Sequence, residues 1–118
     1  MIANTTALPG TLCLHLAGAL DADGAAALRP GFESLGQEAR QDVVLDLSDV
    51  SYLDGAGVGA VAYLFKRLAA KGRRLRLQGV EGQPLSTLRA LGLHRVFGLD
   101  ARQPRLGMVF GKGLAWAR

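Results

Sequence analysis

Cysteine and aromatic residues are scarce in this sequence of 118 residues. Cys13 is the single cysteine, and aromatic residues make up 6% of the chain. One thiol forms neither an internal disulfide nor a site with several thiolate ligands, which excludes a disulfide scaffold and the multi-cysteine zinc sites. Because Cys13 lies in an apolar stretch, we expect it to be a small buried residue of the core.

Residues suited to catalysis are also few. The two histidines, His15 and His94, lie in an expected strand and in a leucine-rich turn. Neither has a spacing that joins it to a serine nucleophile or to other metal ligands, and no lysine pattern of the Walker type occurs. We therefore expect no enzymatic activity, no metal and no cofactor, and we interpret both histidines as structural.

Length and composition fit one globular domain with a single core, since 49% of the residues are hydrophobic and 20% are charged. Residues 1–20 carry no formal charge, but Asn4, Pro9 and Gly10 interrupt them and no basic segment precedes them. A signal peptide or a membrane span is therefore not expected. We expect a cytoplasmic domain over residues 1–100, with a tail, residues 101–118, packed on it.

Charge is distributed unevenly along the chain, although the formal net charge is only +4. Eight of the ten acidic residues lie in residues 1–54, and twelve of the fourteen lysines and arginines lie in residues 55–118. Two such halves can complement each other in the fold or face different partners. No helix-turn-helix, zinc or aromatic-basic pattern accompanies the basic half, so we do not expect nucleic-acid binding.

Short apolar runs predict the strands, which fall at residues 11–16, 43–47, 73–80 and 96–97. We expect residues 43–47 to be largely buried on both faces, which favours a sheet that is covered on at least part of both sides.

Helical spacing of apolar residues predicts three helices between these strands, at residues 21–40, 57–70 and 84–91. Asp21 or Asp23 is the expected N-cap of the first, and Pro30 predicts a kink or a new start within it. Gly72 is the expected C-cap of the second. Strands that alternate with helices indicate an α/β domain with right-handed crossovers.

Three glycines, Gly55, Gly57 and Gly59, mark the start of the second helix. Glycines this close cost backbone entropy, so we expect the turn to need a positive φ or the close approach of another backbone. The amides at a helix start also attract anions. This turn is therefore the expected place for recognition.

A dinucleotide-binding motif is one interpretation of this turn. Gly55, Gly57 and Ala60 match its spacing, and Glu81 lies where an acid that binds ribose would lie. Against it, residues 48–54 separate the predicted strand from the glycines, too little chain follows for a second nucleotide-binding half, and Asp54 would repel a pyrophosphate.

A family resemblance is the other interpretation. Residues 43–59, VVLDLSDVSYLDGAGVG, resemble the signature of STAS domains, the fold of bacterial anti-sigma factor antagonists, and the similarity extends over residues 11–97. The resemblance implies a single STAS-like domain, a mixed sheet of about four to five strands packed against about four helices. It also implies a regulatory protein that binds a kinase-fold anti-sigma factor and has no enzymatic activity.

In the antagonists that this chain resembles, the kinase phosphorylates a hydroxyl residue at the helix start and so ends binding. By position, Gly55 takes the place of that acceptor and Ala56 that of a second hydroxyl, and neither can hold a phosphate. Ser51 is a weak substitute acceptor, and Asp54 is expected either to cap the helix or to contact the partner. The expected contact surface is formed by Asp54, Gly55, Ala56, Gly57, Val58, Tyr63, Lys66 and Arg67.

The resemblance leaves a second function open, because STAS domains also serve as accessory subunits of membrane transporters or envelope-assembly complexes. A nucleotide-binding domain that uses Gly55, Gly57 and Ala60 is the third and least favoured hypothesis.

Overall fold

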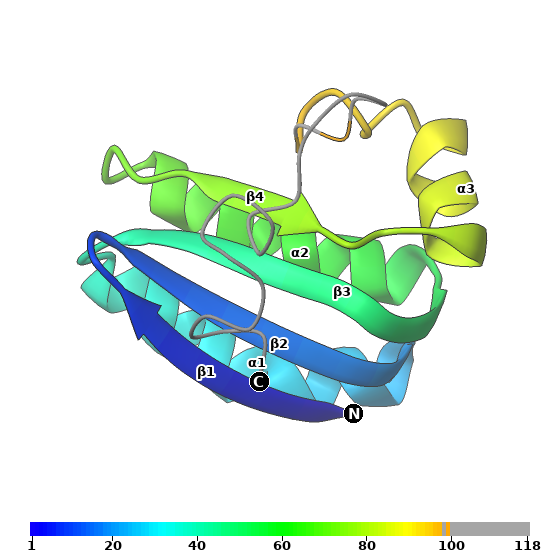
Figure 1. The fold of residues 1–118 in the computed structure, drawn as a ribbon, viewed down its shortest axis with the longest axis horizontal. Helices are drawn as coiled ribbons and strands as arrows, with labels where there is room; N and C mark the ends of the chain where they lie inside the picture. Colours follow the sequence, from blue (N-terminus) through cyan, green and yellow to red (C-terminus); the bar gives the residue numbers. More distant parts are fainter. Residues whose placement is uncertain (98, 100–118) are drawn as a thin grey trace.

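One mixed sheet of four strands forms the centre of the computed structural model, which describes residues 1–97 and 99 (Figure 1). The strands lie in the order β1-β2-β3-β4. β1 is antiparallel to β2, and the pairs β2–β3 and β3–β4 are parallel. Their bounds are β1 Ile2–Leu8, β2 Thr11–Leu20, β3 Asp42–Leu53 and β4 Leu75–Gln78.

Two long helices, α1 (Ala22–Glu38) and α2 (Gly55–Ala69), cover one face of this sheet, and α3 (Gly82–Ala90) lies beside its end (Figure 1). Alternate strand residues turn toward α1 and α2 because successive side chains of a strand point to opposite faces. The core between sheet and helices includes Leu14, Leu16, Phe32, Val43, Leu45, Leu64, Leu68, Leu75 and Leu77. This arrangement confirms the expected α/β class.

β3 is buried on both faces in its first half, as its sequence predicted. Val43, Leu45 and Leu47 belong to the core under the helices, whereas Val44 packs with Cys13 on the other face. Cys13 itself is 1% exposed, so the prediction of a small buried residue is confirmed.

One strand was not predicted, and one strand prediction was wrong. β1 was missed because it is an edge strand whose residues are mostly exposed, so no buried face marks it in the sequence. Residues 96–97 form a turn and not a strand. Phe97 is nevertheless buried, and its ring meets that of Phe65 edge to face at 5.5 Å between centroids.

α1 is continuous through Pro30, so the expected new start does not occur. Pro30 and Ala26, whose carbonyl loses its helical partner, are both exposed, which leaves that carbonyl open to water. Asp21 is the N-cap of α1, one of the two residues expected. α2 ends with Ala70 as its C-cap, and Gly72, the predicted cap, takes a φ of +76° in the turn beyond.

Basic residues of the second half of the chain meet the end of α1, whose last carbonyls have no helical partner. The Lys71 Nζ donates to the Gln37 carbonyl at 2.6 Å, and the Arg73 Nε donates to the Ala39 carbonyl at 2.9 Å. Two basic side chains from the second half of the chain thus bind carbonyls at the end of α1.

The carboxyl ends of the parallel strands β2 and β3 meet at one edge of the sheet, where α1 and α2 both begin (Figure 1). β3 runs to Leu53, so the expected separation of strand and glycines by residues 48–54 was wrong. The strand continues because its second half still pairs with β2 across irregularities of register. Asp54 alone joins β3 to α2.

No helix within residues 1–97 and 99 has both the length and the apolar character needed to cross a membrane. The predicted tail, residues 101–118, lies outside the described residues.

Candidate functional site

The carboxylate of Asp54 caps the first turn of α2. Its Oδ1 accepts from the amides of Ala56 at 3.0 Å and Gly57 at 3.3 Å, while its backbone is extended, with a φ of −126°. An N-cap satisfies helix amides that have no intrahelical partner. The capping role expected as one alternative for Asp54 is therefore confirmed.

Gly57 is buried against the end of β2. A Cβ on this residue would collide with the Leu20 carbonyl oxygen and with the side chain of Leu53. The expected close approach is therefore confirmed at Gly57, whereas none of the three glycines has a positive φ. Gly57 allows α2 to pack closely on the sheet, and because it is buried it offers little surface to a binding partner.

Gly55, Ala56 and Gly59 lie at the surface of the same turn. A Cβ at Gly55 or Gly59 would meet no atom within 4 Å. Val58 is half-buried and packs against the core. The accessible part of the predicted contact surface therefore begins with Gly55 and Ala56.

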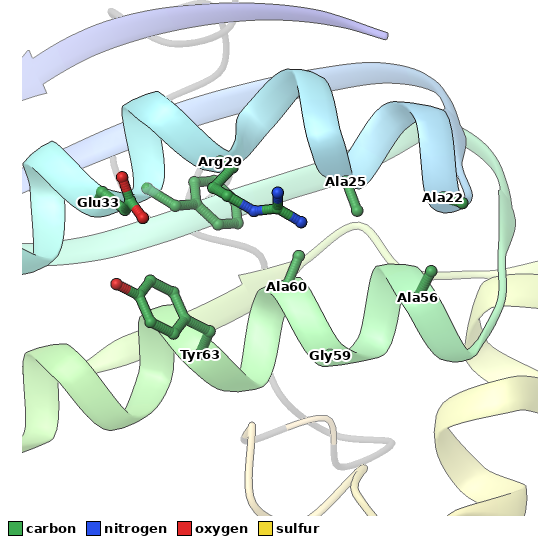
Figure 2. A pocket seen from close by; sticks show the side chains of 9 residues that line it. Ala22, Ala25, Arg29, Glu33, Ala56, Gly59, Ala60 and Tyr63 are labelled. Atoms are coloured by element: carbon green, nitrogen blue, oxygen red, sulfur yellow. The ribbon is translucent and has the colours of Figure 1, made fainter.

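A groove of about 410 Å³ lies between the first halves of α1 and α2 (Figure 2). Small apolar residues form much of its wall, and the side chains of Arg29, Glu33 and Tyr63 reach it from the two helices (Figure 2). Its lining residues are Ala22, Ala25, Arg29, Phe32, Glu33, Ala56, Gly59, Ala60 and Tyr63. The groove thus joins Ala56 and Tyr63, two predicted contact residues, to α1.

The α1 side of this groove was missed by sequence reasoning. Ala25, Arg29 and Phe32 recur at helical spacing, which is a signal for a common face of α1. That signal does not say which helix lies opposite, and only the pairing of α1 with α2 turns the face into a groove.

Tyr63 and Arg67 lie one turn apart on α2. The Arg67 Nη1 donates to the Tyr63 hydroxyl at 3.4 Å, and its guanidinium lies 5.7 Å from the ring centroid. Arg67 is half-buried against Gly36 of α1, whereas Lys66 is exposed on another side of the helix. The predicted contact residues of α2 therefore do not all share one face.

His15, one of the two histidines interpreted as structural, lies on β2 between two carboxylates of β3. Its Nδ1 is 3.2 Å from the Asp46 Oδ2 and its Nε2 is 2.9 Å from the Asp49 Oδ2. Asp46 is buried within β3, and its Oδ1 also accepts from the Ser48 amide at 3.0 Å. Within residues 1–97 and 99, no group of three or more histidine, cysteine or acidic side chains could hold a metal.

The nucleotide interpretation meets a new objection in this geometry. The amides of Ala56 and Gly57, which would receive a pyrophosphate, already bind the Asp54 carboxylate. An incoming anion would have to displace a covalently tethered one, and the two negative charges would repel each other.

A family model for STAS domains matches residues 3–105, which confirms the resemblance drawn from residues 43–59. A curated relative, the anti-sigma-B factor antagonist of Bacillus subtilis (strain 168), is 27% identical over 89 residues, which cover 75% of this chain and 81% of that protein.

Solved structures share the fold. The Bacillus cell fate determinant SpoIIAA, in its phosphorylated form, matches with a TM-score of 0.65 at 19% identity, over 80% of this chain and 86% of that chain. A sulfate transporter family protein from Wolinella succinogenes matches with a TM-score of 0.64 at 20% identity, over 78% of this chain and 73% of that chain.

Proposed function

Because this chain belongs to the STAS domain family, we propose that it is a regulatory anti-sigma factor antagonist that binds a kinase-fold anti-sigma factor in the cytoplasm. The observation that carries this proposal is the accessible helix start, where Gly55 and Ala56 are exposed and Asp54 holds the backbone in place. Similarity to a curated anti-sigma-B factor antagonist supports the same function.

The contact surface that we propose begins at Gly55 and Ala56 and follows α2 to Tyr63, and the exposed Lys66 borders it from another side of the helix. It includes the groove between α1 and α2, because Ala56 and Tyr63 line that groove. Asp54 and Gly57 act within this surface by fixing its shape. Arg67 supports Tyr63 from the next turn.

We propose further that the usual phosphorylation switch is missing at this site. Gly55 and Ala56 stand where the resemblance places the hydroxyl residues, and neither carries an acceptor oxygen. A phosphate on this turn would add a dianion close to the Asp54 carboxylate and would oppose packing against a partner. This chain lacks that means of release at its helix start.

A binding experiment tests the contact surface. The immobilised chain should retain a partner with a histidine-kinase-like ATPase fold from a lysate of the native cell. Gly55→Arg should abolish retention, because a Cβ at this position points into open space, so the fold can accept the arginine while its side chain blocks the partner. Ala69→Arg, an exposed change at the other end of α2, is the matched control and should retain the partner. Equal retention by Gly55→Arg would contradict the proposed surface.

Phosphorylation of the recovered pair tests the missing switch. After incubation with ATP, mass spectrometry should find no stable phosphate on residues 54–58 of the natural chain, whereas Gly55→Ser should gain one. Ala22→Ser, which places a hydroxyl at the first residue of α1, should gain none. Phosphate on Ser51 of the natural chain would show that the switch persists elsewhere.

A second candidate function is that of an accessory subunit in a membrane transporter or envelope-assembly complex. The fold shared with a sulfate transporter family protein favours it, and a helix start without a phospho-acceptor suits a permanent assembly. Capture of an ABC-type ATPase or a permease, in place of a kinase fold, would support this candidate.

Calorimetry tests the nucleotide hypothesis. Titration of the chain with common nucleotides should show no heat of binding, which would exclude that hypothesis.

A further inference from the structure

The last residue of β3 is bonded by side chains and not by a neighbouring strand on the β4 side. β4 pairs with β3 only from Val43 to Asp46, and β3 continues to Leu53. The N–H and C=O of a strand residue point to the same side, so Leu53 presents one donor and one acceptor beyond the end of β4. α3 supplies the partners of both.

The carboxamide of Gln83 takes the place of a peptide group opposite Leu53. Its Oε1 accepts from the Leu53 amide at 2.8 Å, and its Nε2 donates to the Leu53 carbonyl at 2.8 Å. Only one orientation of the carboxamide satisfies both backbone groups, because the amide only donates and the carbonyl only accepts.

Thr87, one turn further along α3, completes this set of hydrogen bonds. Its hydroxyl donates to the Leu53 carbonyl at 3.2 Å and accepts from the Gln83 Nε2 at 3.0 Å. Both hydrogens of the carboxamide are therefore used. We name Gln83 and Thr87 together the α3 clamp.

The α3 clamp acts on the residue directly before the helix start. Leu53 precedes Asp54, whose own amide donates to the Leu20 carbonyl at 3.4 Å on the opposite side. That same carbonyl leaves no room for a side chain at Gly57. The junction between β3 and α2 is thus held by β2 on one side and by α3 on the other.

Buried apolar residues also hold α3 to the domain. Pro84 and Leu88 are buried and anchor the helix. Gln83 is exposed, yet both polar atoms of its side chain form hydrogen bonds with Leu53 or Thr87. α3 therefore has apolar anchors of its own, and the polar atoms of Gln83 bind the end of β3.

We propose that Gln83 is a positioning residue, through which α3 fixes the backbone of the Asp54–Val58 turn. Its importance for partner binding rests on the proposed function, but its effect on the turn does not. A protein that draws α3 away, or competes for the Gln83 carboxamide, would loosen the start of α2.

Amide hydrogen exchange of the full chain, measured by NMR, tests this role in the absence of any partner. Gln83→Met keeps the length of the side chain and removes both hydrogen bonds to Leu53. We expect about tenfold faster exchange at the Leu53 amide and a severalfold increase at Ala56 and Gly57, with Leu45 unchanged. Gln83→Glu retains the acceptor and should give an intermediate result at Leu53.

Ser86→Ala, at an exposed position of the same helix, is the matched control and should leave all these rates unchanged. Faster exchange confined to Leu53 would overturn the proposal, because the clamp would then not reach the turn. Equal acceleration at Leu45 would overturn it as well, since Gln83 would then serve only global stability. Failure to capture a kinase-fold partner would contradict the proposed function and would leave this result unaffected.

Discussion

The two long helices begin with the same local arrangement. α1 has Asp21 as its N-cap and Gly24 three residues later, and α2 has Asp54 and Gly57 at the same spacing. Each aspartate accepts from the amide of its glycine, at 2.9 Å in α1 and 3.3 Å in α2. Each glycine lies so close to a carbonyl at the end of β2 that a Cβ would collide with it.

The two starts differ in the residues between cap and glycine. α1 has Ala22 and Asp23 there, whereas α2 has Gly55 and Ala56 and no acidic residue in its first turn. The shared aspartate and glycine are therefore devices of the fold that place a helix on this sheet. What distinguishes the candidate site is the small, uncharged surface at Gly55 and Ala56.

The largest expected effect concerns the two buried glycines. Gly57→Ala and Gly24→Ala should each lower the free energy of unfolding by about 3 kcal/mol, because each methyl group must push a helix away from a backbone carbonyl. Urea denaturation, monitored by circular dichroism, measures the free energy of unfolding of both variants. Similar losses would show that the two helix starts rest on the same kind of contact, a glycine against a backbone carbonyl at the end of β2.

Gly59→Ala is the control for these two changes, since its Cβ would meet no atom within 4 Å. It should leave stability unchanged or raise it slightly. A Gly57→Ala variant as stable as the natural chain, beside a damaged Gly24→Ala variant, would break the comparison, because α2 would then be free to shift.

The caps give the next largest effect. Asp54→Ala should cost about 1 to 2 kcal/mol, since it removes two hydrogen bonds, and Asp21→Ala should cost about 1 kcal/mol or less. The difference has a second cause, because Asp23 still complements the dipole of α1 whereas α2 has no other acid in its first turn. Denaturation of both variants measures these costs.

Asparagine at either position keeps the accepting oxygen and separates the cap from the charge. Asp54→Asn should therefore recover most of the loss. A larger cost for Asp21→Ala than for Asp54→Ala would reverse the expected order.

The helix starts were predictable because their chemistry is local. An aspartate followed by a helical stripe indicates a cap, and the resemblance over residues 43–59 located the turn at Gly55. The length of β3 was not predictable in the same way. Ser48, Asp49 and Ser51 are typical of turns, and they lie in a strand because β2 pairs with that segment through an irregular register.

The parts of the site that depend on tertiary contacts were beyond the sequence. Arg29 reaches the groove only because α1 packs beside α2. Gln83 follows Leu53 by thirty residues, and no local pattern connects a carboxamide at the start of one helix with the end of a distant strand. Local signals thus placed the turn, and packing decided what surrounds it.

The smallest expected effect concerns the first residue of each helix. It tests whether the fold requires glycine at position 55. Gly55 has no positive φ and open space around it, so Gly55→Ala should raise the free energy of unfolding by about 0.5 kcal/mol. Ala22→Gly in α1 is the reciprocal change and should lower it by a similar amount. If denaturation shows that Gly55→Ala destabilises the domain, glycine is required there by the backbone. If it gains stability as expected, no fold requirement accounts for a residue without a side chain at this position, and contact with a partner becomes the better physical reason.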